Sequence, residues 1–209
     1  MRTAVVCDVD GTILDISERH FRSYLRALSA VGGRALPKAE YWALKRRGGP
    51  LADVMSASEV TDVDRFRSAF DDAIEDPELL ALDVPFPGVP DALGRVISRG
   101  RPIVLASFRK SRPALLEQVA GLGIGLSPTA VVTASALAGA AEKAAAARTA
   151  LGTPGAAAWF GDTEADAAAA AILSVPFIAV TCGMRDAVFL ERLNPAATFT
   201  TLVEGLASL

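Results

Sequence analysis

The chain has 209 residues, of which 51% are hydrophobic and 22% are charged, and its formal net charge is −3. This content is enough to bury one good core, and it excludes a disordered protein. The slight acidic excess gives no general attraction for nucleic acid, and no apolar run approaches the roughly 20 residues that cross a bilayer. The N-terminal residues lack a secretory pattern. We therefore expect a cytoplasmic protein, a monomer or homodimer, with a small-molecule partner and with neither nucleic acid nor a membrane as partner.

The first predicted element is a strand over residues 3–8, whose apolar run ends at the first of two aspartates, Asp8 and Asp10. In open α/β sheets, ligands gather beyond the carboxyl ends of the strands. Two carboxylates there can hold a divalent cation and attack a phosphorus atom. A second interpretation is that Asp10 and Gly11, between apolar residues, form a tight hairpin turn that needs neither metal nor substrate. These residues alone leave both interpretations open.

Residues 16–83 show helix-like apolar spacing, as at Phe21, Leu25 and Leu28, and contain no strand of comparable quality. Turn chemistry flanks this segment, with Gly11 on one side and the Pro/Gly-rich residues 85–88 on the other. We therefore predict a helical insertion that could hinge over the rest of the protein.

From residue 84 onward, short apolar runs alternate with helix-like stretches, a pattern typical of a parallel sheet flanked by helices. Glycines such as Gly100 and Gly152 are placed as helix stops. The fold class predicted is α/β, a Rossmann-like doubly wound parallel sheet core with a small α-helical domain. The expected strands after residue 84 are 103–106, 130–132, 157–160 and 177–180, and the expected helices are 89–99, 112–120, 140–151 and 164–173.

Two polar residues, Ser107 and Lys143, lie at positions of this predicted fold where they could contact a phosphate. Ser107 comes at the carboxyl end of a predicted strand, where a hydroxyl can donate to a phosphate oxygen, although a serine there is usually ordinary turn chemistry. Lys143 lies near the start of a predicted alanine-rich helix. It could neutralise phosphate charge, but a solubilising surface lysine is the commoner case.

The predicted strand 157–160 is followed by Asp162 and, four residues later, by Asp166. One helical turn brings these two carboxylates to the same side. Since Mg²⁺ prefers oxygen ligands, Asp162 could complete a site that Asp8 begins. A second interpretation is that Asp166 forms a capping box with Thr163. This interpretation accounts for Asp166 but not for Asp162.

Together these residues resemble the four motifs of the haloacid dehalogenase superfamily of phosphatases, and the agreement covers nearly the whole chain. The motifs in chain order are Asp8 with Asp10, Ser107, Lys143, and Asp162 with Asp166. The helical segment resembles the small mobile cap of that family, which implies a cap at 16–83 and a catalytic core at 1–15 and 84–209. One departure is Ala144, because the family's third-motif lysine is often followed by proline.

The resemblance implies a Mg²⁺-dependent phosphatase of a small phosphorylated metabolite, in the style of phosphoglycolate phosphatase. Asp8 would be the nucleophile that forms an aspartyl-phosphate, and Asp10 the acid and then the base. Asp8, the backbone carbonyl of Asp10, and Asp162 would bind the ion, while Asp166 would act through water or orient Lys143. Lys143 would offset negative charge in the transition state. A β-phosphoglucomutase-like sugar phosphomutase, or a catalytically silent phosphate-sensing domain, are the alternatives.

Substrate choice is expected to come from the helical segment. His20 and the basic run Lys45, Arg46 and Arg47 could meet the non-reacting end of the substrate, and Arg109 follows Ser107 closely. For each of these residues an ordinary interpretation competes: packing within the cap for His20, and a solvated helix face or surface exposure for the others. A single histidine without a serine or cysteine nucleophile motif also argues against triad chemistry.

Overall fold

A computed structural model describes residues 3–152 and 155–209 of the chain. Its centre is a six-stranded sheet in the order β5-β4-β1-β6-β7-β8, and every pair of neighbouring strands is parallel. The predicted α/β class is confirmed. The strands are β1 (Ala4–Cys7), β4 (Ile103–Ser107), β5 (Val131–Thr133), β6 (Ala156–Gly161), β7 (Phe177–Val180) and β8 (Ala197–Phe199).

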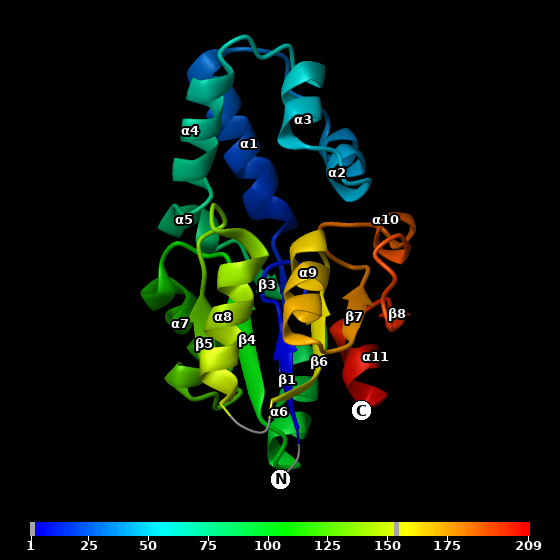
Figure 1. The fold of residues 1–209 in the computed structure, drawn as a ribbon. Coiled ribbons are helices and arrows are strands. Elements are labelled where there is room, and N and C mark those ends of the chain that lie inside the picture. Colours follow the sequence, from blue (N-terminus) through cyan, green and yellow to red (C-terminus); the bar gives the residue numbers. More distant parts are fainter. Residues whose placement is uncertain (1–2, 153–154) are drawn as a thin grey trace.

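Helices cover both faces of this sheet (Figure 1). Val5 and Cys7 of β1 pack on one side and Val6 on the other, as the two-residue period of a strand requires. The first face packs against α6 (Val89–Ser98), α7 (Arg112–Gly121) and α11 (Leu202–Ala207). The second packs against α8 (Gly139–Leu151), α9 (Glu164–Leu173) and α10 (Ala187–Glu191). A short 3₁₀ helix, η1 (Pro128–Ala130), precedes β5.

The segment between β2 (Leu14–Asp15) and β3 (Val84–Pro85) forms a helical module above the carboxyl ends of the strands (Figure 1). It has a hydrophobic cluster of its own, which includes Tyr24, Tyr41 and Phe66. We call residues 16–83 the cap segment. Its helices are α1 (Ser17–Val31), α2 (Lys38–Arg46), α3 (Leu51–Ala57), α4 (Val63–Ala73) and α5 (Pro77–Leu80).

The chain enters and leaves the cap segment through two adjacent short strands. β2 pairs antiparallel with β3, and the predicted boundaries fall beside this pair. β1 itself pairs with β4 and β6, and not with the residues that follow Gly11. The hairpin interpretation of Asp10 and Gly11 is therefore wrong, although the chain does turn there.

The predicted strands and helices of the core agree with the structure to within one residue at each end. Three elements, β8, α10 and α11, were not predicted from the sequence. β8 is a three-residue edge strand with only partly buried ends, so it lacks the long apolar run that marks the inner strands. None of the helices in the described residues is long and apolar enough to span a membrane.

Candidate active site

The predicted motif residues of the core converge at the carboxyl edge of the sheet. Asp8 follows β1, Ser107 ends β4, and Asp162 follows β6, and these three strands are neighbours in the sheet. Lys143 comes from α8 and Asp166 from α9. Parallel strands present their carboxyl ends at one edge, which explains why residues more than 150 positions apart share one site.

Lys143 is buried at the centre of this group, with 1% of its surface exposed. Its Nζ donates to Oδ1 of Asp8 at 2.6 Å and to Oδ1 of Asp166 at 2.8 Å. Burial lowers the pKa of Lys143, but the carboxylates of Asp166 and Asp8 outweigh this and raise the pKa well above its ordinary value. The interpretation of Lys143 as a surface lysine is therefore excluded.

Small side chains on α8 and α9 allow this close approach. Ala144 and Ala147 of α8 and Ala169 and Ala170 of α9 are completely buried between the two helices and the sheet. A lysine side chain at position 143 can then extend to the end of β1, with its ammonium 4.8 Å from the centre of the Phe108 ring. The alanine-rich composition thus has a packing role.

Three buried carboxylates, Asp8, Asp162 and Asp166, form a group that could hold a metal ion, because one ligand oxygen from each lies within 4.8 Å of the others. Burial and the charge of Asp166 raise the pKa of Asp162 to about 7. Burial, followed by the charge of Asp166, also raises the pKa of Asp8 well above its usual range. Such crowded carboxylates are stabilised by a hard divalent cation, and the donor set fits Mg²⁺.

Asp166 differs from the other two because its oxygens are already engaged. Oδ1 accepts from Lys143 and from Nε1 of Trp159, while Oδ2 accepts from the backbone N–H and the hydroxyl of Thr163. The capping box predicted for Thr163 and Asp166 is present. Four hydrogen bonds use the lone pairs that a direct metal ligand needs, so this geometry favours Asp166 as the residue that orients Lys143.

The backbone at two glycines lies unusually close to the Asp162 carboxylate, which leaves no room for a side chain there. A Cβ atom built on Gly11 would lie 2.1 Å from Oδ2 of Asp162, and one on Gly183 would lie 2.0 Å from the same atom. The N–H of Met184 donates to this oxygen at 2.5 Å, and the hydroxyl of Thr12 donates to Oδ1 at 3.2 Å. The loop after β7 is therefore part of the site, although neither Gly183 nor Met184 was predicted from the sequence.

Asp10 is held by two arginines. Nε and Nη2 of Arg109 donate to its two oxygens at 2.6 and 2.7 Å, and Nη2 of Arg19 donates to Oδ1 at 2.6 Å. The Ser107 hydroxyl donates to Oδ2 of Asp10 at 3.3 Å. Burial raises the pKa of Asp10, but Arg19 and Arg109 outweigh it and hold the pKa far below its usual range. Arg109 is among the residues predicted from the sequence, and Arg19 is not.

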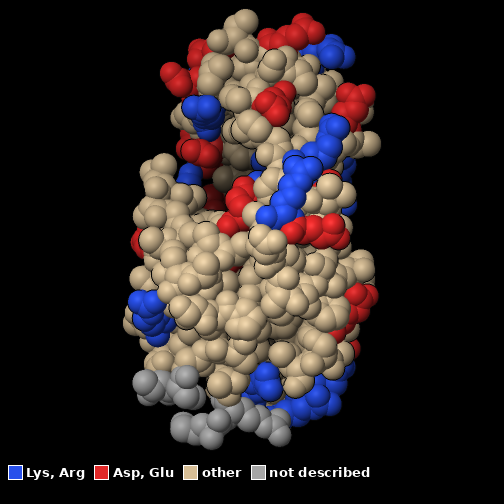
Figure 2. Space-filling model, turned by 45° about the vertical axis from the view of Figure 1, so that its right-hand side comes forward, with Lys and Arg blue, Asp and Glu red and all other residues tan. Residues whose placement is uncertain are grey.

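A cavity of about 270 Å³ opens between the core and the cap segment at this point. Asp8, Asp10, Ser107 and Lys143 line it, together with residues of the cap segment that include Arg19, His20 and Glu75. Figure 2 shows a hollow between the helical upper part and the lower part, with acidic side chains at its edge. The cavity has room for a small molecule beside these side chains.

His20 lines this cavity, and its ring also packs near Trp42 and Phe70, at 6.0 and 6.2 Å between ring centroids. Burial, aided by the charges of Arg19 and Lys45, lowers the pKa of His20 well below its usual value, so the imidazole is neutral. Its Nδ1 is buried and has no hydrogen-bond partner. The predicted packing role and a contact to a ligand are both compatible with this position.

The basic run lies at the carboxyl end of α2. Among the described residues, Lys45, Arg46 and Arg47 are not part of the lining of the cavity at Asp8. Burial and Arg185 lower the pKa of Lys45 to about 8. Arg47 is exposed and donates to the Ala43 carbonyl of its own helix at 3.0 Å.

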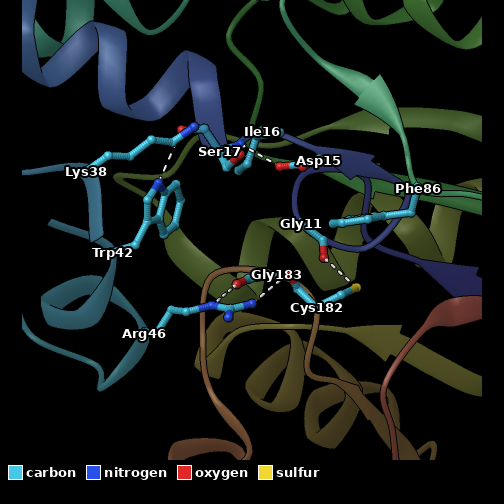
Figure 3. A pocket seen from close by; sticks show the side chains of 10 residues that line it. All are labelled: Gly11, Asp15, Ile16, Ser17, Lys38, Trp42, Arg46, Phe86, Cys182 and Gly183. Carbon is cyan, nitrogen blue, oxygen red and sulfur yellow. Dashed lines mark hydrogen bonds between the residues drawn. The ribbon is translucent and has the colours of Figure 1, made fainter. Parts of the chain in front are cut away.

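Arg46 instead reaches the core (Figure 3). Its Nε donates to the Gly183 carbonyl at 3.0 Å, and its Nη2 donates to those of Thr181 and Cys182 at 3.2 and 2.8 Å. It lines a second cavity of about 300 Å³, together with Trp42, Phe86 and seven other residues. The contacts of Arg46 fasten the cap segment to the loop that holds Asp162.

Comparison with known proteins gave one family and many structures. The model of a family described as haloacid dehalogenase-like hydrolase matches residues 3–173. No curated protein sequence matched the chain. A haloacid dehalogenase-like hydrolase from Streptococcus pneumoniae superposes with a TM-score of 0.76 at 21% identity, covering 99% of this chain and 97% of that one.

Two further structures carry phosphatase names. A predicted phosphatase from Clostridium acetobutylicum is 17% identical, with a TM-score of 0.76, and the match covers 100% of this chain and 98% of that one. A predicted phosphoglycolate phosphatase from Haemophilus somnus is 16% identical, with a TM-score of 0.72, and the match covers 99% and 97%. At these identities the likeness establishes a shared fold over the full length of the chain.

Proposed function

Since the chain belongs to the haloacid dehalogenase-like hydrolases, we propose that it is a Mg²⁺-dependent phosphatase that hydrolyses a small phosphomonoester through an aspartyl-phosphate. The observation that carries this proposal is the buried contact of Lys143 with Asp8 and Asp166, at the mouth of a cavity large enough for a small metabolite. A buried ammonium between carboxylates supplies the fixed positive charge that phosphoryl transfer needs. The cap segment would cover this cavity and select the substrate.

Asp8 would attack the phosphorus atom. Lys143, at 2.6 Å from Oδ1 of Asp8, would orient the carboxylate and offset its repulsion from the phosphate. The Ser107 hydroxyl would donate to a phosphate oxygen. Asp8 and Asp162 would hold Mg²⁺, which would supply further positive charge at the phosphate when bound.

Asp10 would move the proton. As the ester bond breaks, its carboxylic acid would donate a proton to the leaving alkoxide, and the phosphoryl group would remain on Asp8. The Asp10 carboxylate would then take a proton from the water that attacks the aspartyl-phosphate, which releases phosphate and free Asp8 and leaves Asp10 protonated again. Asp10 must therefore spend part of the cycle away from the two arginines that hold it here.

The test is phosphate release from a broad panel of phosphomonoesters, with Mg²⁺ and after chelation. Acid quenching during turnover should trap a phosphoryl group on the peptide that contains Asp8, detected by mass spectrometry, and Asp8→Asn should abolish both signals. Isomerisation of a sugar phosphate without net phosphate release would instead show a phosphomutase, which shares the chemistry up to the aspartyl-phosphate. The absence of both activities and of the adduct would leave a silent phosphate-sensing domain.

A further inference from the structure

The carboxylate of Asp10 is bound as a substrate carboxylate would be. Arg109 meets it with two parallel hydrogen bonds, at 2.6 and 2.7 Å, and Arg19 adds a third at 2.6 Å. This two-pronged contact is the geometry with which arginine recognises planar carboxylates. Both arginines line the cavity at Asp8, and their side chains are only 2% and 3% exposed.

The arginine pair is held in place by contacts other than Asp10. Asp83, whose side chain is completely buried, accepts from Nε of Arg19 at 2.9 Å and from Nη2 of Arg109 at 2.6 Å. Nη1 of Arg19 also donates to the Ile74 carbonyl at 3.1 Å. The two guanidinium groups would therefore keep their positions if the Asp10 carboxylate turned away.

If the Asp10 carboxylate leaves, the positive charge of Arg19 and Arg109 makes the pair a binding site for another anion. Asp83 balances one of the two guanidinium charges, and Glu75 acts on Arg109 more weakly than Asp10 or Asp83 does. Without Asp10, one buried positive charge lacks a contacting partner, and a buried unpaired charge is costly.

We propose that Arg19 and Arg109 form a subsite for a carboxylate on the leaving group of the substrate, and that Asp10 occupies this subsite in the structure described here. Binding of the substrate carboxylate displaces Asp10 toward the leaving-group oxygen. The substrate class is then a small phosphomonoester whose alcohol part bears a carboxylate. The inference rests on the proposed phosphatase function, and Arg19 adds a residue of the cap segment to substrate recognition.

Calorimetric titration of the Asp8→Asn protein separates binding from turnover. The probes are 2-phosphoglycolate and 2-hydroxyethyl phosphate, which have the same number of carbons and differ in the carboxylate, titrated in the presence of Mg²⁺. We expect the carboxylated ester to bind at least about tenfold more tightly. Equal dissociation constants for the two esters would overturn the subsite.

Charge-preserving variants identify the residues responsible. In the same background, Arg109→Lys keeps the charge and loses the two-pronged contact, so it should remove most of the preference for the carboxylated ester. Arg19→Lys should reduce it in the same way and serves as the second variant if Arg109→Lys does not fold. Arg22→Lys is the matched control, because Arg22 lies exposed on the same helix and pairs with Glu18. A preference that survives Arg109→Lys and Arg19→Lys unchanged would also overturn the proposal.

Turnover by the wild-type protein tests the proposed function separately. If the carboxylated ester binds selectively but no phosphoester is hydrolysed, the subsite stands and the phosphatase proposal fails. If both esters bind equally and are hydrolysed at equal rates, the phosphatase proposal stands and the subsite fails. These two results therefore distinguish failure of the subsite from failure of the phosphatase proposal.

Discussion

Asp162→Asn is expected to stabilise the metal-free protein at alkaline pH and to remove its stabilisation by Mg²⁺. In the structure, burial and the neighbouring Asp166 raise the pKa of Asp162 from 3.8 to about 7. At pH 8 the group is ionised in both the folded and the unfolded states. The shift then corresponds to about 4 kcal/mol of destabilisation, at about 1.4 kcal/mol per pKa unit.

Asparagine has no charge, but it also loses one acceptor. Asp162 accepts from Thr12 through Oδ1 and from Met184 through Oδ2, and an amide offers only one oxygen. A lost buried hydrogen bond costs about 1–2 kcal/mol. The net gain expected for Asp162→Asn at pH 8 is therefore about 2–3 kcal/mol in the free energy of unfolding.

The sign of the pH dependence follows from proton binding. Between about pH 4 and pH 7 the folded wild-type protein binds more protons at Asp162 than the unfolded chain does, so its stability falls as the pH rises through this window. The asparagine variant lacks this contribution. Its advantage should vanish near pH 4, where only the lost hydrogen bond remains.

Urea unfolding in EDTA at pH 4.5, 6 and 8, followed by tryptophan fluorescence, measures these differences, because the buried Trp159 reports on the core. Addition of Mg²⁺ at 100 times its dissociation constant should raise the stability of the wild type by about 2.7 kcal/mol and that of the variant much less. Asp72→Asn, at an exposed position of α4, is the control. A variant less stable than the wild type at pH 8 in EDTA, or a difference that is the same at every pH, would refute the reasoning.

Three further substitutions test separate parts of the site. Asp8→Asn should abolish phosphate release while cooperative unfolding is retained, and activity near that of the wild type would remove Asp8 as the nucleophile. Lys143→Met should lower the free energy of unfolding in EDTA by about 3–5 kcal/mol, because it leaves buried carboxylates without their counter-charge, and Mg²⁺ should restore part of this loss. Arg46→Ala should weaken Mg²⁺ binding about tenfold in calorimetry, since Arg46 fastens the loop whose backbone holds Asp162, whereas Arg47→Ala should leave it unchanged.

The sequence predicted those parts of the molecule that depend on local patterns. Each inner strand is a continuous apolar run, so its end is visible in the sequence, and this pattern alone places Asp8, Ser107 and Asp162 at one edge of the sheet. The burial of Lys143 was harder to predict, because an alanine-rich helix with one lysine is also typical of a solvated surface. Only the packing of α8 on α9 shows that its side chain is buried.

Other features arise from contacts between distant residues that no local pattern marks. Arg19 meets Asp83 across 64 positions, and Arg46 meets the Gly183 carbonyl across 137. An arginine on an amphipathic helix looks the same in sequence whether it faces solvent or a buried carboxylate. Gly183 could have been found only from the close approach of its backbone to Asp162, which is a property of the assembled fold.

Arginine side chains connect the cap segment to the core at two places, and we expect different ligands to affect the two contacts. Arg19 of α1 binds Asp10 of the core, and Arg46 of α2 binds the loop after β7. A ligand shifts a conformational equilibrium only through its different affinities for the two states. A substrate carboxylate that replaces Asp10 would act on the first contact, while Mg²⁺ at Asp162 would act on the second, through the N–H of Met184. We therefore expect that a firmly closed cap requires both ligands, because neither one stabilises both contacts.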